Sequence, residues 1–233
     1  MLKHVKPSTP FAILLFGLLA AIFGAAPAFA QAGSGGCGPL TNGYGPYDYR
    51  TDRDKLQIVI GAHFTPEVEA LIRGSSGYIG GDIDYTLRAI PNNHRALIAM
   101  MRLGEKQNTP KPQGSRYTVE CWFERAVQFA PDDSIVRMIY SEYLNSKGRI
   151  PEATAQLDTA TTYAKDNPFT HYNIGLHYFD LKNYDKALVE AHKAIELGFT
   201  QTALRDKLQG VGKWVEPAAL PAAPASAPAE QPK

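Results

Sequence analysis

The chain has 233 residues, enough for one or two ordinary domains. Hydrophobic residues make up 44% of it and charged residues 20%, which excludes both wholesale disorder and a membrane protein with many spans. The 24 basic and 23 acidic side chains give a formal net charge of +1, whereas nucleic-acid-binding proteins normally carry a basic excess. Two cysteines are too few for a disulfide-rich small protein or a four-cysteine zinc site.

Residues 1–30 have the features of an export signal. Lys3 and Lys6 carry positive charge ahead of an uncharged apolar run over residues 11–25. This run is shorter than the ~20 residues that a membrane-spanning helix needs. Ala28 and Ala30 supply small residues at the two positions that a signal peptidase reads. The sequence therefore predicts cleavage after Ala30 and a periplasmic or secreted protein; a retained membrane anchor is the alternative.

Export also bears on the two cysteines, Cys37 and Cys121. Disulfides form in oxidising compartments, and an even number of cysteines allows both to be paired. The sequence therefore predicts a bond between Cys37 and Cys121. Two free thiols are the alternative that the sequence leaves open.

Two segments lack the pattern of a folded element. Residues 31–52 are rich in Gly, Tyr and Pro and are expected to be irregular. In the C-terminal segment 215–233, proline and alanine fill twelve of the last seventeen positions, so a disordered tail is expected. No second long apolar run follows residue 30, so we expect no membrane span once the signal has been cleaved.

A 34-residue period runs through the middle of the chain. It is carried by small or apolar residues in three series: Val119, Ala153, Ala187; Phe123, Leu157, Ala191; and Ala126, Ala160, Ala194. Within each repeat the three positions fall at i, i+4 and i+7, which is one face of a helix. Ser141 and Gly175 are also 34 apart and would let a preceding antiparallel helix pack closely. The period therefore predicts a repeated pair of helices.

One repeat resembles a known family. The run Tyr172-Asn173-Ile174-Gly175-x-x-Tyr178, then Tyr184-Asp185-x-Ala187 and Ala194, resembles a tetratricopeptide repeat over residues 168–201. His171 stands where that family favours tryptophan, and Phe199 stands where proline is usual. Residues 134–167 form a weaker copy. A third, over residues 92–133, requires an inserted loop at residues 108–115.

The resemblance implies an all-α fold, an α-solenoid of antiparallel helix pairs with three repeats. Capping helices are expected at residues 53–91 and 202–214, because the ends of such a stack need covering. Thr65 and Pro66 indicate a helix start, and residues 82–90 fit a second helix. The periodicity of residues 56–60 does not distinguish a strand from a helix.

The sequence shows no pattern of catalytic or metal-ligating residues. His171 and His177 point in roughly opposite directions on one expected helix and cannot share a metal ion. Asp82 and Asp84 are best interpreted as residues near a helix start, where carboxylates complement the dipole. Cys121 has no neighbouring cation to favour a thiolate. We therefore expect no enzyme activity, no cofactor and no metal.

The expected partner-binding groove lies on the first helices of the repeats. It comprises Ile135, Met138, Glu142, Phe169, Tyr172, Asn173, Leu176 and Phe179. The best-known peptide site of the resembled family clamps a carboxylate with lysine and asparagine. Met138 and Glu142 depart from that pattern, whereas Asn173 matches it. An apolar, mildly acidic groove suits an amphipathic helix or an extended apolar segment; the alternative is that some of these aromatics are core residues.

Two classes of function follow. The first is an exported, non-catalytic scaffold or assembly factor that binds another protein or peptide segment of the cell envelope and no nucleic acid. The second is an accessory subunit or an enzyme, with an active site built from residues 42–49 and the region of Asp82. A pocket lined by converging ionisable groups between the N-terminal segment and the repeats would favour the second class.

Overall fold

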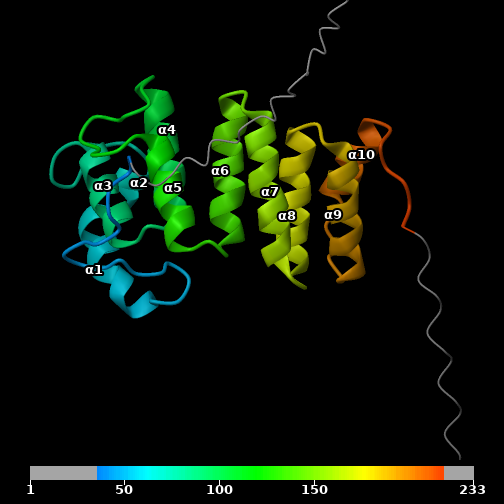
Figure 1. Cartoon of the computed structure of the whole chain (residues 1–233), viewed down its shortest axis with the longest axis horizontal. Coiled ribbons are helices and arrows are strands. Elements are labelled where there is room, and N and C mark those ends of the chain that lie inside the picture. The colour runs from blue at the N-terminus through cyan, green and yellow to red at the C-terminus, as the bar shows by residue number, and fades with distance from the viewer. Residues whose placement is uncertain (1–35, 218–233) are drawn as a thin grey trace, which may run out of the picture. The chain divides into compact units, whose positions relative to one another are not determined.

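The computed structural model describes residues 36–217 (Figure 1). Over this range the chain forms ten α-helices and no β-strand, which confirms the predicted all-α class. The predicted export signal and residues 218–233 of the predicted tail lie outside the described residues. Residues 36–52 contain no helix, as the sequence predicted. None of the helices within residues 36–217 is both long and apolar enough to cross a lipid bilayer.

The first three helices are α1 (Arg53–His63), α2 (Pro66–Glu69) and α3 (Ile79–Ala89). The ambiguous residues 56–60 are helical, and Leu56 and Val59 form a small core with Ala89, Ile90 and surrounding tyrosines. The helix that starts at Pro66 ends after one turn. It ends because Leu71 takes a left-handed conformation with φ 56°, and Ile72 N–H donates back to Glu67 O.

Seven helices follow in order along the chain. They are α4 (His94–Lys106), α5 (Val119–Phe129), α6 (Ser134–Ser146), α7 (Ile150–Ala164), α8 (Pro168–Asp180), α9 (Tyr184–Glu196) and α10 (Ala203–Gly210). Helices α6 and α7 form one closely packed pair, and α8 and α9 form another. Figure 1 shows α6 to α9 side by side in chain order, and α7 also packs against α8.

Helices α4, α6 and α8 begin with the same kind of side-chain N-cap. Asn93, Asp133 and Asn167 are the N-cap residues, and each side chain accepts a hydrogen bond from a backbone N–H of the first turn. Asp133 and Asn167 are 34 residues apart, in register with the apolar period. The 34-residue repeat therefore includes the polar N-cap residues as well as the core residues.

Helices α6 and α8 also end in the same kind of turn. Gly148 and Lys182, also 34 residues apart, have left-handed backbones with φ 72° and 60°. The N–H groups of Gly148 and Arg149 donate back into the last turn of α6, and those of Lys182 and Asn183 do the same in α8. This pattern is the Schellman C-cap, which reverses the chain in a few residues. Each pair is therefore joined by a short turn, as the period predicted.

The residues of the 34-residue series lie in the core. All nine are buried on α5, α7 and α9. Gly175 is buried on α8, where a Cβ atom would lie 2.5 Å from Leu204 Cδ2 of α10 and 3.2 Å from Glu190 Cβ of α9. The predicted capping helix is shorter than residues 202–214, and its Leu204 and Leu208 are buried.

The irregular N-terminal segment is fastened to α5. Cys37 and Cys121 form a disulfide with a Cα–Cα distance of 5.3 Å, as the sequence predicted. One turn further along α5, the buried Arg125 guanidinium donates to the carbonyls of Cys37, Gly38 and Pro39 at 2.8, 3.0 and 2.8 Å. Positions i and i+4 of a helix lie on one face, so the disulfide and the Arg125 hydrogen bonds both hold residues 37–39.

Candidate functional site

Helix α8 carries two apolar stripes. Its buried stripe contains His171, Ile174, Gly175 and Tyr178. The second consists of the exposed Phe169 and the half-buried Tyr172, Leu176 and Phe179; we call it the α8 face. The spacings of 3, 4 and 3 place these four residues on one side of the helix. The last three pack against the edge of the core, whereas the Phe169 side chain is 60% exposed.

Phe199 extends the α8 face at the N-terminal end of the helix. Its ring centroid lies 4.6 Å from that of Tyr172 and 6.2 Å from that of Phe169. A Schellman cap at the end of α9 positions Phe199, because Gly198 has φ 88° and the Phe199 N–H donates to Ala194 O. Three aromatic rings from two segments therefore form one partly exposed cluster.

At the other end, the α8 face meets Tyr184 and helix α10. The rings of Phe179 and Tyr184 are 5.2 Å apart, and Lys207 Nζ lies 5.1 Å from the Phe179 ring centroid. A cation at this distance from an aromatic ring is attracted to its face. The α8 face is therefore bordered by a cationic side chain at Phe179 and by an open aromatic cluster at Phe169.

The predicted groove residues on α6 take different positions. Ile135 is exposed at 41% and Glu142 is also exposed, but Met138 is only 6% exposed and belongs to the hydrophobic core. Burial lowers the pKa of His177 on α8, and the negative charges of Glu142 and Asp180 oppose that shift. The charge of Glu142 therefore acts on α8, which packs against α6.

Asn173, which matches one residue of the resembled carboxylate site, makes a local contact. Its Nδ2 donates to Phe169 O one turn earlier, at 2.7 Å. One of its two N–H donors is therefore used within α8. The structure brings Phe169 and Tyr172 together with Phe199, a residue that was not among the predicted groove residues. A glycine followed by an aromatic residue at a helix end is the sequence signal that would have identified it.

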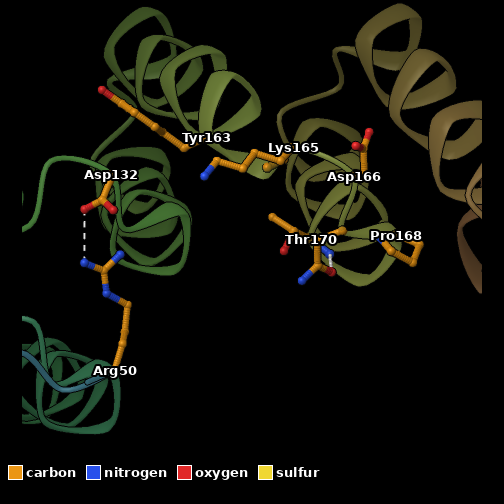
Figure 2. A pocket seen from close by; sticks show the side chains of 9 residues that line it. Arg50, Asp132, Tyr163, Lys165, Asp166, Pro168 and Thr170 are labelled. Atoms are coloured by element: carbon orange, nitrogen blue, oxygen red, sulfur yellow. Dashed lines mark hydrogen bonds and ion pairs between the residues drawn. The ribbon is translucent and has the colours of Figure 1, made fainter. Parts of the chain in front are cut away.

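A cleft of about 600 Å³ lies between the N-terminal segment and the start of α8. Its ionisable lining residues are Arg50, Asp132, Tyr163, Lys165 and Asp166. Figure 2 shows Arg50 turned toward Asp132, with Lys165 and Asp166 across the cleft. The Arg50 guanidinium is paired with Asp48 at 2.7 Å and with Asp132 at 3.0 Å. Its charge is therefore already neutralised by carboxylates of the protein.

A buried polar network adjoins this cleft. Asp133 accepts hydrogen bonds from His94 Nε2 at 2.9 Å and Asn92 Nδ2 at 3.0 Å, and also caps α6. Burial opposes ionisation of Asp133, but the bonds from His94, Asn92 and the backbone outweigh it and lower its pKa. The network satisfies its own polar groups and joins the N-terminal segment to the start of α6.

The carboxylates of Asp82 and Asp84 are bound by neighbouring groups of the protein. The Asp82 carboxylate accepts from Ser75 N–H at 2.8 Å, from the Ser76 hydroxyl at 2.9 Å, and pairs with His63 at 3.0 Å. Asp84 binds Arg88 at 2.9 Å and accepts from the Arg116 N–H at 2.7 Å. Asp82 lies in the first turn of α3, as expected, but it holds the preceding loop as well as facing the helix dipole.

A comparison with known proteins found no family model that matches the chain and no curated protein that is significantly similar to it. The likeness to tetratricopeptide repeats is therefore carried by the residues of the 34-residue period and by the paired helices described above.

Proposed function

We propose that the protein is an exported, non-catalytic scaffold or assembly factor whose helix pairs form a solenoid of the tetratricopeptide type. In this proposal its partner is an apolar segment of another envelope protein, bound along the α8 face. The observation that carries the proposal is the aromatic cluster of Phe169, Tyr172 and Phe199, which is continuous with Leu176 and Phe179 and leaves Phe169 60% exposed.

Two features support a solenoid. The core residues, helix caps and turns all repeat with the same 34-residue spacing from α6 to α9. Helix α10 covers Gly175 and the end of α8, as a capping helix of a repeat stack does. These features support the repeats at residues 134–167 and 168–201. For the proposed first repeat at residues 92–133, with its inserted loop between α4 and α5, the support is the apolar series Val119, Phe123 and Ala126 on α5.

The chemistry of the α8 face favours an apolar ligand segment. Its side chains are aromatic or aliphatic, with the exposed Glu142 on the neighbouring α6 and Lys207 Nζ 5.1 Å from the Phe179 ring centroid. An amphipathic helix or an extended apolar segment would bury its apolar side chains against the rings. Exposed aromatic residues in a contiguous patch are typical of protein interaction sites.

The test compares two equally exposed apolar residues on neighbouring helices. Phe169 on α8 is 60% exposed, and Val189 on α9 is 65% exposed and lies off the α8 face. Tagged full-length Phe169→Ala and Val189→Ala proteins would be used to capture partners from envelope extracts. We expect Phe169→Ala to lose a partner that wild type and Val189→Ala retain, with melting midpoints unchanged. Equal capture by both variants would refute the proposal.

The alternative function is an accessory subunit or enzyme with its site in the N-terminal segment. The cleft lined by Arg50, Asp132, Lys165 and Asp166 is the observation that favours it. If this cleft is the functional site, Lys165→Ala should abolish function in a cell-based assay while Phe169→Ala leaves it intact. The opposite result favours the scaffold.

A further inference from the structure

A carboxyl group lies directly against the disulfide. Glu124 Oε2 is 2.9 Å from the Cys37 sulfur. A carboxylate oxygen of Glu124 and the sulfur atoms of Cys37 and Cys121 all lie within 4.8 Å of one another. A disulfide sulfur carries no proton, so it cannot donate a hydrogen bond to this carboxyl. A protonated Glu124 carboxyl can instead donate to the sulfur, which is a weak acceptor. The contact therefore places a carboxyl proton directly beside Cys37 when the bond opens.

The two cysteine residues differ in exposure. Cys37 is only 6% exposed, whereas Cys121 is partly exposed. An external thiolate attacks the more accessible sulfur of a disulfide and expels the other as the leaving group. Attack should therefore fall on Cys121, and the leaving sulfur is Cys37, the one that contacts Glu124.

We propose that Cys37–Cys121 is an exchange-active disulfide and that Glu124 is the proton donor to the departing Cys37 sulfur. The reductant is a dithiol, one of whose thiolates bonds to Cys121 Sγ. The electron pair of the broken S–S bond passes to Cys37, which takes the Glu124 proton. The second thiol of the reductant then displaces Cys121, which takes up the proton that this thiol loses. Glu124 regains from water the proton released when the first thiol became a thiolate. The protein therefore gains two electrons and two protons, and the reductant becomes a disulfide.

The surroundings of Glu124 suit this role. Burial raises its pKa, and the negative charge of Glu120 on the same helix raises it further, while Arg149 opposes the shift. The negative charge of an ionised Glu124 also acts on Tyr140 of α6. The Arg125 guanidinium, one turn along α5 from Cys121, donates to the Cys37 carbonyl at 2.8 Å. Glu124 thus retains its proton to a higher pH than an exposed glutamate.

Opening the bond does not detach the N-terminal segment. Arg125 still holds the carbonyls of residues 37–39. Further along, Tyr47 N–H donates to Ala89 O at 2.9 Å, and Tyr49 N–H donates to Asn92 Oδ1 at 2.9 Å. The reduced cysteines therefore stay close together, and the bond can form again.

The experiment measures reduction of the native full chain by dithiothreitol between pH 5 and pH 8, with each rate divided by the thiolate concentration. Wild type is compared with Glu124→Gln and with the control Glu152→Gln, which alters a carboxylate bound to Arg149 but not in contact with sulfur. For wild type we expect the normalised rate to fall about tenfold as Glu124 ionises, because its proton is lost and its charge then opposes the thiolate. Glu124→Gln should give a flat profile, and Glu152→Gln should follow wild type.

A second readout locates the attack. Brief treatment with glutathione, followed by alkylation and peptide mass spectrometry, should find the mixed disulfide on Cys121 and the alkyl group on Cys37. Parallel pH profiles for wild type and Glu124→Gln, or glutathione on Cys37, would overturn the proposal.

Discussion

At the scale of single residues, the stability of the protein depends on a few positions that are closely packed or that carry a buried charge. Gly175 is one, because a side chain there would enter the contacts of both Leu204 and Glu190. Its recurrence with Ser141 at 34 residues indicated a close approach of α8 and α9. The sequence did not indicate that α10 makes the closest contact, because residues 202–214 lie outside the period.

Gly175→Leu should therefore destabilise the protein strongly. Overpacking costs about 1–3 kcal/mol or more when backbone must move. Gly61→Leu on α1 is the matched control, since no atom lies within 4 Å of a Cβ added there. Urea denaturation should show a large loss for Gly175→Leu and little change for Gly61→Leu. Similar midpoints for the two variants would contradict the assigned packing.

Asp133 makes stability dependent on pH. Its pKa lies below the ordinary 3.8, so the stability it contributes is present above that pH and is lost as the pH falls through its folded pKa. Asp133→Asn keeps a good N-cap but cannot ionise. We expect wild type to be more stable by about 1–3 kcal/mol at pH 7, with the difference shrinking as the pH falls below 3.8. A difference in the free energy of unfolding that is constant with pH would exclude this role.

At the scale of helices, the caps and turns explain what could be predicted. Helices α6 to α9 were predictable because apolar period, N-caps and turns agree on the same boundaries. Helix α1 was not, since its run Leu-Gln-Ile-Val-Ile fits both a strand and a helix, whereas the helix start expected at Pro66 and the helix expected over residues 82–90 correspond to α2 and α3. What orders that region is contacts between distant residues, such as Arg50 with Asp132, 82 positions apart, and these leave no local signal.

The candidate site could also be predicted only in part from the sequence. The spacing of Phe169, Tyr172, Leu176 and Phe179 identified the α8 face. Met138 was assigned to the groove from the equivalent face of α6, but α6 packs against α4, α5, α7 and α8, so more of its surface is covered. Phe199 was missed because its position depends on the left-handed backbone of Gly198.

The turn after α8 offers a stabilising substitution. Lys182 occupies a left-handed conformation that costs a non-glycine residue roughly 1–2 kcal/mol, whereas Gly148 fills the equivalent turn after α6. Lys182→Gly should therefore raise the free energy of unfolding by about 0.5–1 kcal/mol, and Gly148→Ala should lower it by a similar amount. Urea denaturation of both variants checks the pair; two changes of the same sign would contradict the shared turn geometry.

At the scale of the whole molecule, the disulfide bears on the predicted export of the protein. The bond between Cys37 and Cys121 persists in an oxidising compartment. Intact mass spectrometry of protein purified from the envelope should show a chain that begins at Gln31 and is two mass units lighter than the dithiol form. A mass that includes residues 1–30 would contradict cleavage.

The central claim is that the α8 face binds a partner and is not simply core. Tyr172→Ala tests it most directly, because Tyr172 joins the exposed cluster with Phe199 to the edge of the core. Truncation of an aromatic interface residue commonly costs ~2 kcal/mol or more of binding energy, equivalent to a loss of at least about tenfold in affinity. The measurement is partner capture by full-length Tyr172→Ala alongside its melting midpoint. We predict capture reduced at least about tenfold with a nearly unchanged midpoint; an unfolded variant, or full capture, would contradict the claim.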